Sequence, residues 1–382
     1  MLVLLPSSRG GISLRLAATA VIFVALLLAT PAHAQDLAAQ IEAMFQPYAG
    51  QDAPGMAVIA LRNGNVVFRG AYGLAELERR TPITAKTDFR LASLTKEFTA
   101  MAIMLLAHDN RLRYDDPITR FFPEFPAYGR QITVRHLLNH TSGLLDYEDI
   151  YAEQTRGLPE DKIPQIHDDQ ILRMMEKQTA TKFPPGTRWE YSNTGYALLA
   201  MIIERTSGQT YPEFLRDRIF RPLHMDNTVA YVNGRNTVPN RAFGYRRSKD
   251  GKSWEFSDQS PTSAVLGDGG IYTNIEDMAK WDAGLCNHTL LSAAEMHAAI
   301  TPVPLAAKGP HDEPAQYGFG WFVDPYKGHQ RMWHYGETCG FLTSIQRLTN
   351  ERITVIVLAN RIDIDPGALA LKVVDLMLQT PK

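Results

Sequence analysis

The chain has 382 residues, of which 45% are hydrophobic and 21% are charged, and its formal net charge at pH 7 is −2. This length allows a large core, and we expect two lobes within one compact unit. Because no Lys/Arg-rich block accompanies the near-neutral charge, the composition excludes the basic footprint of a nucleic-acid-binding protein.

The N-terminus has the pattern of a secretory signal. Arg9 and Arg15 precede an apolar run at 16–29, and Ala32-His33-Ala34 places small residues where a signal peptidase reads them. We predict that residues 1–34 are a signal peptide and that the protein is periplasmic or secreted. The run has 14 residues, whereas a bilayer span needs ~20. We therefore expect no stable membrane anchor after cleavage.

Residues 35–382 are predicted to form one domain, whose first elements are a helix and a hairpin. Apolar residues recur at helical spacing in 36–48, and two β-rich runs follow at 56–61 and 66–72. Asn63-Gly64 between these runs is a strong hairpin signal. A second helix is expected behind residue 95, where apolar residues recur at three and four positions through 98–106.

The middle of the chain, at about 110–300, is predicted to be an α-rich lobe inserted between the first and last strands. Helical patterns occur at 133–143, 168–178 and 197–223. In the first of these, His136 and His140 stand four residues apart, a spacing that suits zinc. We reject a metal site because the acid of an H-E-x-x-H motif is missing and no third ligand is evident. A structural pair at a helix end is the prediction.

The last quarter is β-rich. Strands are predicted at 317–323, 331–335, 341–348 and 352–358, followed by an amphipathic helix at 368–378. Two strands early and four late, with helices at both ends, indicate an α/β (α+β) fold. Its sheet would be mixed, mainly antiparallel, built from both chain ends and flanked by helices.

Cys286 and Cys339 are the only cysteines. An exported protein could pair them. Nothing in the sequence brings them together, so a disulfide stays open as the less favoured alternative to two buried thiols.

Ser93 and Lys96 stand three residues apart at the predicted start of the second helix. Their side chains would share one face, which places a candidate base beside a candidate nucleophile. The helix start also offers backbone N–H groups and a positive dipole end to an oxyanion. Alone, this motif is more often a helix cap next to a solvated lysine.

Two further motifs change that reading. The ordered set of Ser93-x-x-Lys96, Tyr191-Ser192-Asn193 and His334-Tyr335-Gly336 resembles that of the class C β-lactamase-related serine hydrolases and penicillin-binding proteins. The resemblance covers nearly all of the chain after the signal. It implies a β-lactamase/transpeptidase-like fold and no cofactor or metal. No G-x-S-x-G elbow occurs, so an α/β-hydrolase triad is not supported.

The resemblance also implies roles for individual residues. Ser93 would attack an acyl carbonyl and form an acyl-enzyme, while Lys96 and Tyr191 would take its proton as a coupled pair and return it to the leaving group. Asn193 would hold Lys96 and the acyl side chain of the substrate.

The third motif would lie on a strand beside the nucleophile. Gly336 would let the strand approach the substrate, and the backbone N–H of Glu337 would join that of Ser93 in an oxyanion hole. His334 and Tyr335 replace the Lys and Thr that meet a substrate carboxylate in the penicillin-binding enzymes. A histidine is largely neutral at pH 7, so carboxylate recognition should be weaker here.

The leading hypothesis is an exported serine hydrolase of esterase type, acting on a small-molecule ester, amide or peptide. The alternative is a peptidase or amidase for D-amino-acid substrates, or a weak β-lactamase. The alternative from outside the enzymes is a scaffold that binds peptidoglycan or a protein partner. The sequence does not determine the oligomeric state.

Overall fold

The computed structural model describes residues 32–159, 162–310 and 312–380. The predicted signal peptide at 1–34 lies almost entirely outside them. The α-helices are α1 (Ala32–Phe45), α2 (Thr95–His108), α3 (Val134–Leu138), α4 (Tyr147–Gln154), α5 (Asp168–Glu176), α6 (Asn193–Ser207), α7 (Tyr211–Leu215), α8 (Ile275–Cys286), α9 (Ala293–Ile300) and α10 (Pro366–Gln379).

The longer strands belong to one sheet. Its members are β1 (Met56–Arg62), β2 (Asn65–Tyr72), β12 (Phe322–Val323), β13 (Arg331–Thr338), β14 (Phe341–Leu348) and β15 (Ile353–Ala359). The shorter strands are β3 (Leu74–Glu76), β4 (Thr81–Pro82), β5 (Phe89–Arg90), β6 (Val229–Ala230), β7 (Tyr245–Arg247), β8 (Trp254–Phe256), β9 (Ile271–Thr273), β10 (Ala307–Lys308) and β11 (Pro314–Ala315).

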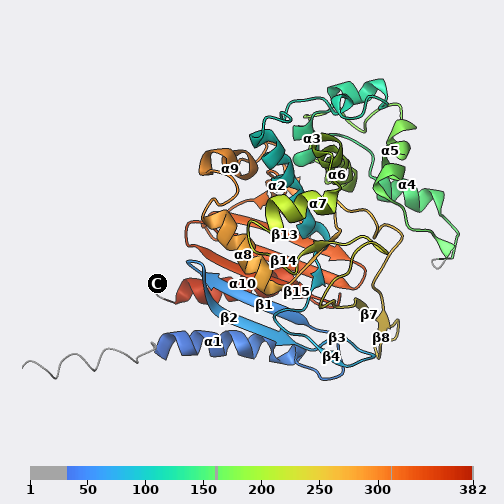
Figure 1. The fold of residues 1–382 in the computed structure, drawn as a ribbon. Helices are drawn as coiled ribbons and strands as arrows, with labels where there is room; N and C mark the ends of the chain where they lie inside the picture. Colours follow the sequence, from blue (N-terminus) through green and yellow to red (C-terminus); the bar gives the residue numbers. More distant parts are fainter. Residues whose placement is uncertain (1–31, 160–161, 311, 381–382) are drawn as a thin grey trace, which may run out of the picture.

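The main sheet has the order β12-β13-β14-β15-β1-β2, and every neighbouring pair is antiparallel. The pairing of β1 with β15 joins the two ends of the chain, as predicted (Figure 1). The α+β fold class is therefore confirmed. Asn63 and Gly64 both have positive φ values, 54° and 77°, which gives the tight turn that the β1–β2 hairpin requires.

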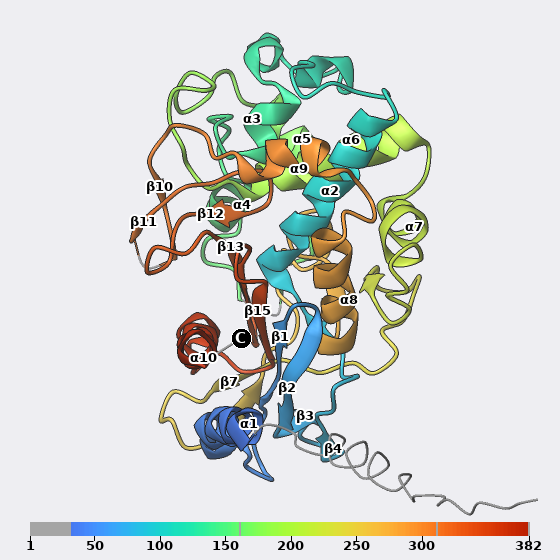
Figure 2. The same ribbon diagram turned by 90° about the vertical axis from the view of Figure 1, so that its left-hand side faces the viewer.

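Helices cover both faces of this sheet. In β1, Ala57 and Ile59 belong to one apolar core and Met56 and Val58 to another, because successive side chains of a strand point to opposite faces. Helices α1 and α10 contribute to the second core. Figure 2 shows α10 on one side of β1 and β15 and α8 on the other. A strand that is buried on both faces gives rigid support to the neighbouring strands and to their side chains.

Three predicted elements are shorter than the pattern suggested. The predicted helix 133–143 is α3, which ends at Leu138. The predicted helix 197–223 is α6, which begins at Asn193 and stops at Gly208, a residue with φ 77°, before α7. The predicted strand 317–323 is reduced to β12. Gly320, at φ 76°, explains the short strand: a Cβ there would lie 2.7 Å from the main-chain oxygen of Lys96. The chain must pass α2 too closely to stay extended.

The two histidines of the middle segment have separate structural roles. His136 closes the N-terminus of α3 by accepting the N–H of Thr133 at 3.2 Å, within a capping box. His140 is buried, and its Nδ1 accepts the N–H of Ser192 at 3.1 Å. Within the described part of the chain, no cluster of three His, Cys, Asp or Glu side chains could hold a metal ion.

Within the same residues, no helix combines the length and apolar character needed to cross a bilayer.

Candidate active site

The turn that carries Ser93 is a short 3-10 helix, Ala92–Leu94, between β5 and the start of α2. Ala92 has a φ of 49°, in the left-handed region that non-glycine residues avoid. Such backbone strain persists only where the surroundings hold it, and it is common at functional sites. Ser93 itself remains partly exposed while its neighbours are buried. The strained turn thus presents one hydroxyl to the outside.

The amine of Lys96 lies behind this hydroxyl and is completely buried. Its Nζ donates to Ser93 Oγ at 3.0 Å, to Asn193 Oδ1 at 2.9 Å and to the main-chain oxygen of Asp268 at 3.0 Å. These three contacts use all three donors of an ammonium group. The structure therefore brings Ser93, Lys96 and Asn193 together, and it adds Asp268, which the sequence analysis did not predict as a site residue.

Tyr191 lies over the same amine, with 4.9 Å between Lys96 Nζ and the centre of the phenol ring. Its hydroxyl is buried and has no hydrogen-bond partner of normal geometry among the described residues. Burial raises the pKa of Tyr191 far above its ordinary value, although the Ser93 hydroxyl opposes the shift. The phenol therefore keeps its proton at neutral pH, and it can act as a proton relay but not as the resting base.

Lys96 has the opposite tendency. Burial lowers its pKa to about 8, against the pull of the carboxylates of Asp268, Glu148 and Asp146. An amine with this pKa is partly neutral near physiological pH, whereas an ordinary lysine is not. Lys96 is thus the member of the pair whose proton can leave at working pH.

Three consecutive residues at the start of α4 hold the other side of the site. Asp146 accepts the N–H of Asn193 at 2.7 Å, and Glu148 accepts the side-chain Nδ2 of Asn193 at 3.1 Å. Between them, the hydroxyl of Tyr147 donates to Asp268 Oδ2 at 2.6 Å. Sequence reasoning missed this group. The one local signal in the sequence is Asp146, a residue type that is typical of helix N-caps and that caps α4. A cap alone does not show which distant residues the neighbouring side chains contact.

Strand β13 runs beside the nucleophile turn. A Cβ on Gly336 would lie 2.1 Å from the main-chain oxygen of Leu91 and 3.1 Å from the N atom of Ser93, so only glycine fits at this position. The next residue, Glu337, has an exposed side chain. The oxyanion role of its N–H stays a prediction.

His334 occupies a different place from the one its motif suggested. The ring is completely buried, Nε2 lies 3.0 Å from the hydroxyl of Tyr317, and Nδ1 lies 2.6 Å from the main-chain oxygen of Tyr335. A carbonyl oxygen can only accept, so Nδ1 carries the hydrogen and Nε2 accepts. Burial and the charge of Lys96 lower the pKa of His334 to about 3. Its ring is neutral, and both nitrogens are used within the protein.

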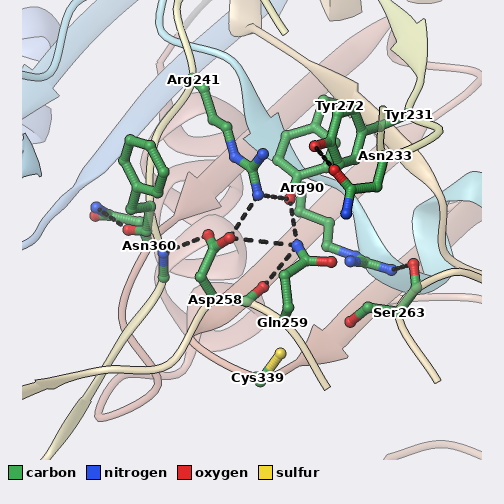
Figure 3. Close-up of polar contacts among 12 residues, drawn as sticks. Arg90, Tyr231, Asn233, Arg241, Asp258, Gln259, Ser263, Tyr272, Cys339 and Asn360 are labelled. Atoms are coloured by element: carbon green, nitrogen blue, oxygen red, sulfur yellow. Dashed lines mark hydrogen bonds and ion pairs between the residues drawn. The ribbon is translucent and has the colours of Figure 1, made fainter. Parts of the chain in front are cut away.

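The loop that leads into β9 is held by arginines (Figure 3). Arg241 pairs with Asp258, and Arg90 donates to the main-chain oxygen of Ser263 at 2.9 Å. Cys339 also lies in this region (Figure 3). Cys339 and Cys286 are both free and only partly buried, so the structure supports two thiols over a disulfide but does not bury them fully.

A hollow of about 1070 Å³ lies elsewhere, between α5, α6 and α7 and the loop after β6. None of the seven residues predicted for the site lines it.

The beta-lactamase family model matches residues 41–374. The chain belongs to the beta-lactamase family. It is a serine hydrolase of the beta-lactamase and penicillin-binding-protein type, and the antiparallel sheet with its flanking helices is the fold of that family.

Within the beta-lactamase family, this chain is similar to penicillin-binding proteins and to enzymes that act on D-amino-acid compounds, as three comparisons show. It is 34% identical to penicillin-binding protein 4* of Bacillus subtilis (strain 168), over 80% of this chain and 67% of that protein. It is 28% identical to a D-aminopeptidase of Gluconobacter oxydans (strain 621H), over 80% of this chain but only 56% of that protein. A D-amino acid amidase structure from Ochrobactrum anthropi SV3 superposes with a TM-score of 0.74 and 26% identity, over 90% and 98% of the two chains.

Gly336 gives this family member a sharp test of its site geometry. We expect Gly336→Ala to lower kcat/KM by about 10²-fold, because the new methyl group would push β13 away from Ser93 by roughly 1 Å. Steady-state kinetics would measure the loss. Gly328→Ala is the control, since a Cβ there would meet nothing within 4 Å, although its φ of 84° adds some strain. Equal rates for Gly336→Ala and the native enzyme would contradict the close approach.

Proposed function

We propose that this protein is an exported amidase or peptidase that cleaves small D-amino-acid amides or peptides with a free amino group next to the scissile carbonyl. The D-aminopeptidase and D-amino acid amidase similarities support the reaction class. Export is supported by the signal pattern of residues 1–34. Cell fractionation with an antibody would test it, and a cytoplasmic protein of unchanged length would contradict it.

The observation that carries the substrate class is the carboxylate of Glu148. It accepts from the amide of Asn193, whose oxygen accepts from the Lys96 amine, and it belongs to a residue that is otherwise exposed. Partial burial, with Asp268 and Asp146 nearby, raises the pKa of Glu148 to about 7. A substrate ammonium group would favour the charged carboxylate and form a charge-assisted hydrogen bond with it.

A substrate carboxylate would have no such charged partner among the residues of the third motif. His334 stands where the penicillin-binding enzymes have a lysine, and it is buried and neutral. Burial raises the pKa of the neighbouring Tyr335, and the acidic side chains of Glu337 and Glu313 add to this shift. These negative charges disfavour a substrate carboxylate, so a free amino group suits the site better than the carboxylate of a penicillin.

In the proposed reaction, Ser93 Oγ attacks the amide carbonyl while its proton passes to neutral Lys96, directly or through the Tyr191 phenol. The negative oxygen of the tetrahedral intermediate would accept hydrogen bonds from the N–H groups of Ser93 and Glu337. The proton then goes to the departing amine as the C–N bond breaks. A water molecule attacks the acyl-enzyme by the same route, which releases the acid and restores Ser93.

Glu148→Gln tests this substrate class. We expect kcat/KM for D-phenylalanine amide to fall about tenfold or more, since a hydrogen bond to a charged group contributes roughly 1.5–3 kcal/mol. The rate with p-nitrophenyl acetate should change much less. Both substrates use the same Lys96, so the ratio of their kcat/KM values isolates the contact with the amino group.

The matched control is Glu153→Gln, which changes an exposed glutamate of the same helix that pairs with Arg156. It should leave the ratio unchanged. Equal rates for D-phenylalanine amide and its N-acetyl derivative would overturn the proposal. High activity on the acetate ester alone would instead favour the esterase, and rapid nitrocefin hydrolysis would favour a β-lactamase.

A further inference from the structure

Asp268 makes two different contacts with the site, although it belongs to neither of the motifs that supply the nucleophile and the phenol. Its main-chain oxygen accepts from Lys96 Nζ at 3.0 Å. Its carboxylate accepts from the hydroxyl of Tyr147 at 2.6 Å. The residue is 7% exposed, so bulk water screens the effect of its charge on the amine much less than it would at the surface.

The loop around Asp268 is held on both sides. Arg90 donates from Nε to the main-chain oxygen of Gly269 at 3.1 Å. Its Nη2 donates to the main-chain oxygen of Ser263, a contact drawn in Figure 3. On the other side, Thr99 of α2 donates to the main-chain oxygen of Gly267 at 2.7 Å. Because α2 also carries Lys96, the loop and the amine are fixed to the same element.

Several titratable groups face Lys96. Some are carboxyl groups, and the others carry no charge at neutral pH. The carboxylates that favour its charged form are, in decreasing order of effect, those of Asp268, Glu148 and Asp146. The groups without charge are the phenol rings of Tyr191 and Tyr196 and the imidazoles of His140 and His334.

Asp268 in turn faces two cations and further acids. Burial raises the pKa of the Asp268 carboxyl group, and Asp146 adds to this shift, whereas Lys96, the Tyr147 hydroxyl and Arg90 favour its ionised form. The pKa of the partly buried Asp168 is raised by desolvation and, to a smaller degree, by the charge of Asp268. Among the carboxylates that face Lys96, that of Asp268 has the largest effect on the amine.

We propose that Asp268 is a positioning residue for the general base: its main-chain oxygen aims the Lys96 amine at Ser93, and its carboxylate balances the ammonium charge of the resting enzyme. Without that carboxylate, Lys96 would hold its proton less tightly and would be a weaker base. The inference rests on the acyl-enzyme chemistry proposed above but not on the choice of substrate.

The experiment measures how fast a fluorophosphonate labels Ser93 between pH 6 and 10, by mass spectrometry of the intact protein. The native enzyme should show a rise with a midpoint near pH 8, where burial places the pKa of Lys96. Asp268→Asn keeps the main-chain oxygen and the side-chain shape but removes the charge. We expect its midpoint to move about one pH unit lower, with a lower plateau.

Asp277→Asn is the control, because Asp277 is also buried but accepts from Asn227 and Thr228, away from Lys96. Its midpoint should match that of the native enzyme. Circular dichroism would verify that each variant is folded. A purely structural role for Asp268 would lower the rate without moving the midpoint, and this result, or a shift to higher pH, would overturn the proposal.

A second variant covers the case in which Asp268→Asn does not fold. Tyr147→Phe keeps the buried ring and removes only the donor to Asp268, so the carboxylate should hold its charge less firmly. We expect a smaller shift in the same direction, and an unchanged midpoint in the folded Phe variant would overturn the proposal. Labelling needs no natural substrate, so the result stays readable if amide hydrolysis is not found.

Discussion

Ser93→Ala should abolish hydrolysis, with kcat/KM lower by more than about 10⁴-fold for every ester or amide that the native enzyme accepts. Ser93 is the partly exposed hydroxyl at the strained turn, and the buried amine of Lys96 lies 3.0 Å from its oxygen. The variant would keep the base, the phenol and the fold but would have no atom to form the acyl bond. Steady-state rates, and mass spectrometry after a fluorophosphonate probe, would measure the loss.

The same measurement separates an enzyme from a binding scaffold. The native protein should gain the mass of one phosphonyl group on the peptide that carries Ser93, and Ser93→Ala should gain none. Ser253→Ala, in the exposed turn between β7 and β8, should label like the native protein. An unlabelled native protein, or full activity in Ser93→Ala, would contradict the acyl-enzyme mechanism. An unlabelled and inactive native protein would favour a scaffold that binds peptidoglycan or a protein partner.

The parts of the site that the sequence predicted are those whose geometry is local or carried by a motif. Ser93 and Lys96 meet because three residues make nearly one helical turn. The meeting with Asn193 depended on the resemblance, since Lys96 and Asn193 are 97 positions apart. Asp268 and Glu148 carry no motif. Their positions follow from how α4 packs against α5 and α6 and how the loop before β9 packs on α2, which no local pattern records.

The fold was predictable for a similar reason and to a similar degree. Two β-rich runs joined by an Asn-Gly turn specify the β1–β2 hairpin, so its bounds were nearly correct. The strand expected at 317–323 failed because Gly320 is set by contact with Lys96 rather than by its own neighbours in sequence. Likewise, His334 reads as a substrate contact from its motif, while the buried hydroxyl of Tyr317, distant in sequence, decides where its ring points.

Lys96→Met should lower kcat/KM by about 10³-fold, since a positioned general base contributes roughly 10²–10⁴-fold. Methionine fills most of the volume of the buried side chain but cannot accept the proton of Ser93. The native enzyme should become faster as the pH rises through about 8, because burial lowers the pKa of Lys96 to that value and only the neutral amine is a base. This rise should be absent in the variant, as pH-dependent kcat/KM values would show.

The pH dependence of the free energy of unfolding gives a second, independent test of the lowered pKa of Lys96. The folded protein holds the Lys96 proton less tightly than the unfolded chain does, since its pKa falls from 10.5 to about 8. Between these two values the unfolded state binds more protons, so the free energy of unfolding should increase with pH over that window. Lys96→Met should lose this increase, whereas Lys182→Met, which changes a lysine paired with Glu190 near the surface, should keep it. If the native enzyme showed neither the rate increase nor the stability increase, the buried amine would not titrate near pH 8, and the assignment of Lys96 as the base would be wrong.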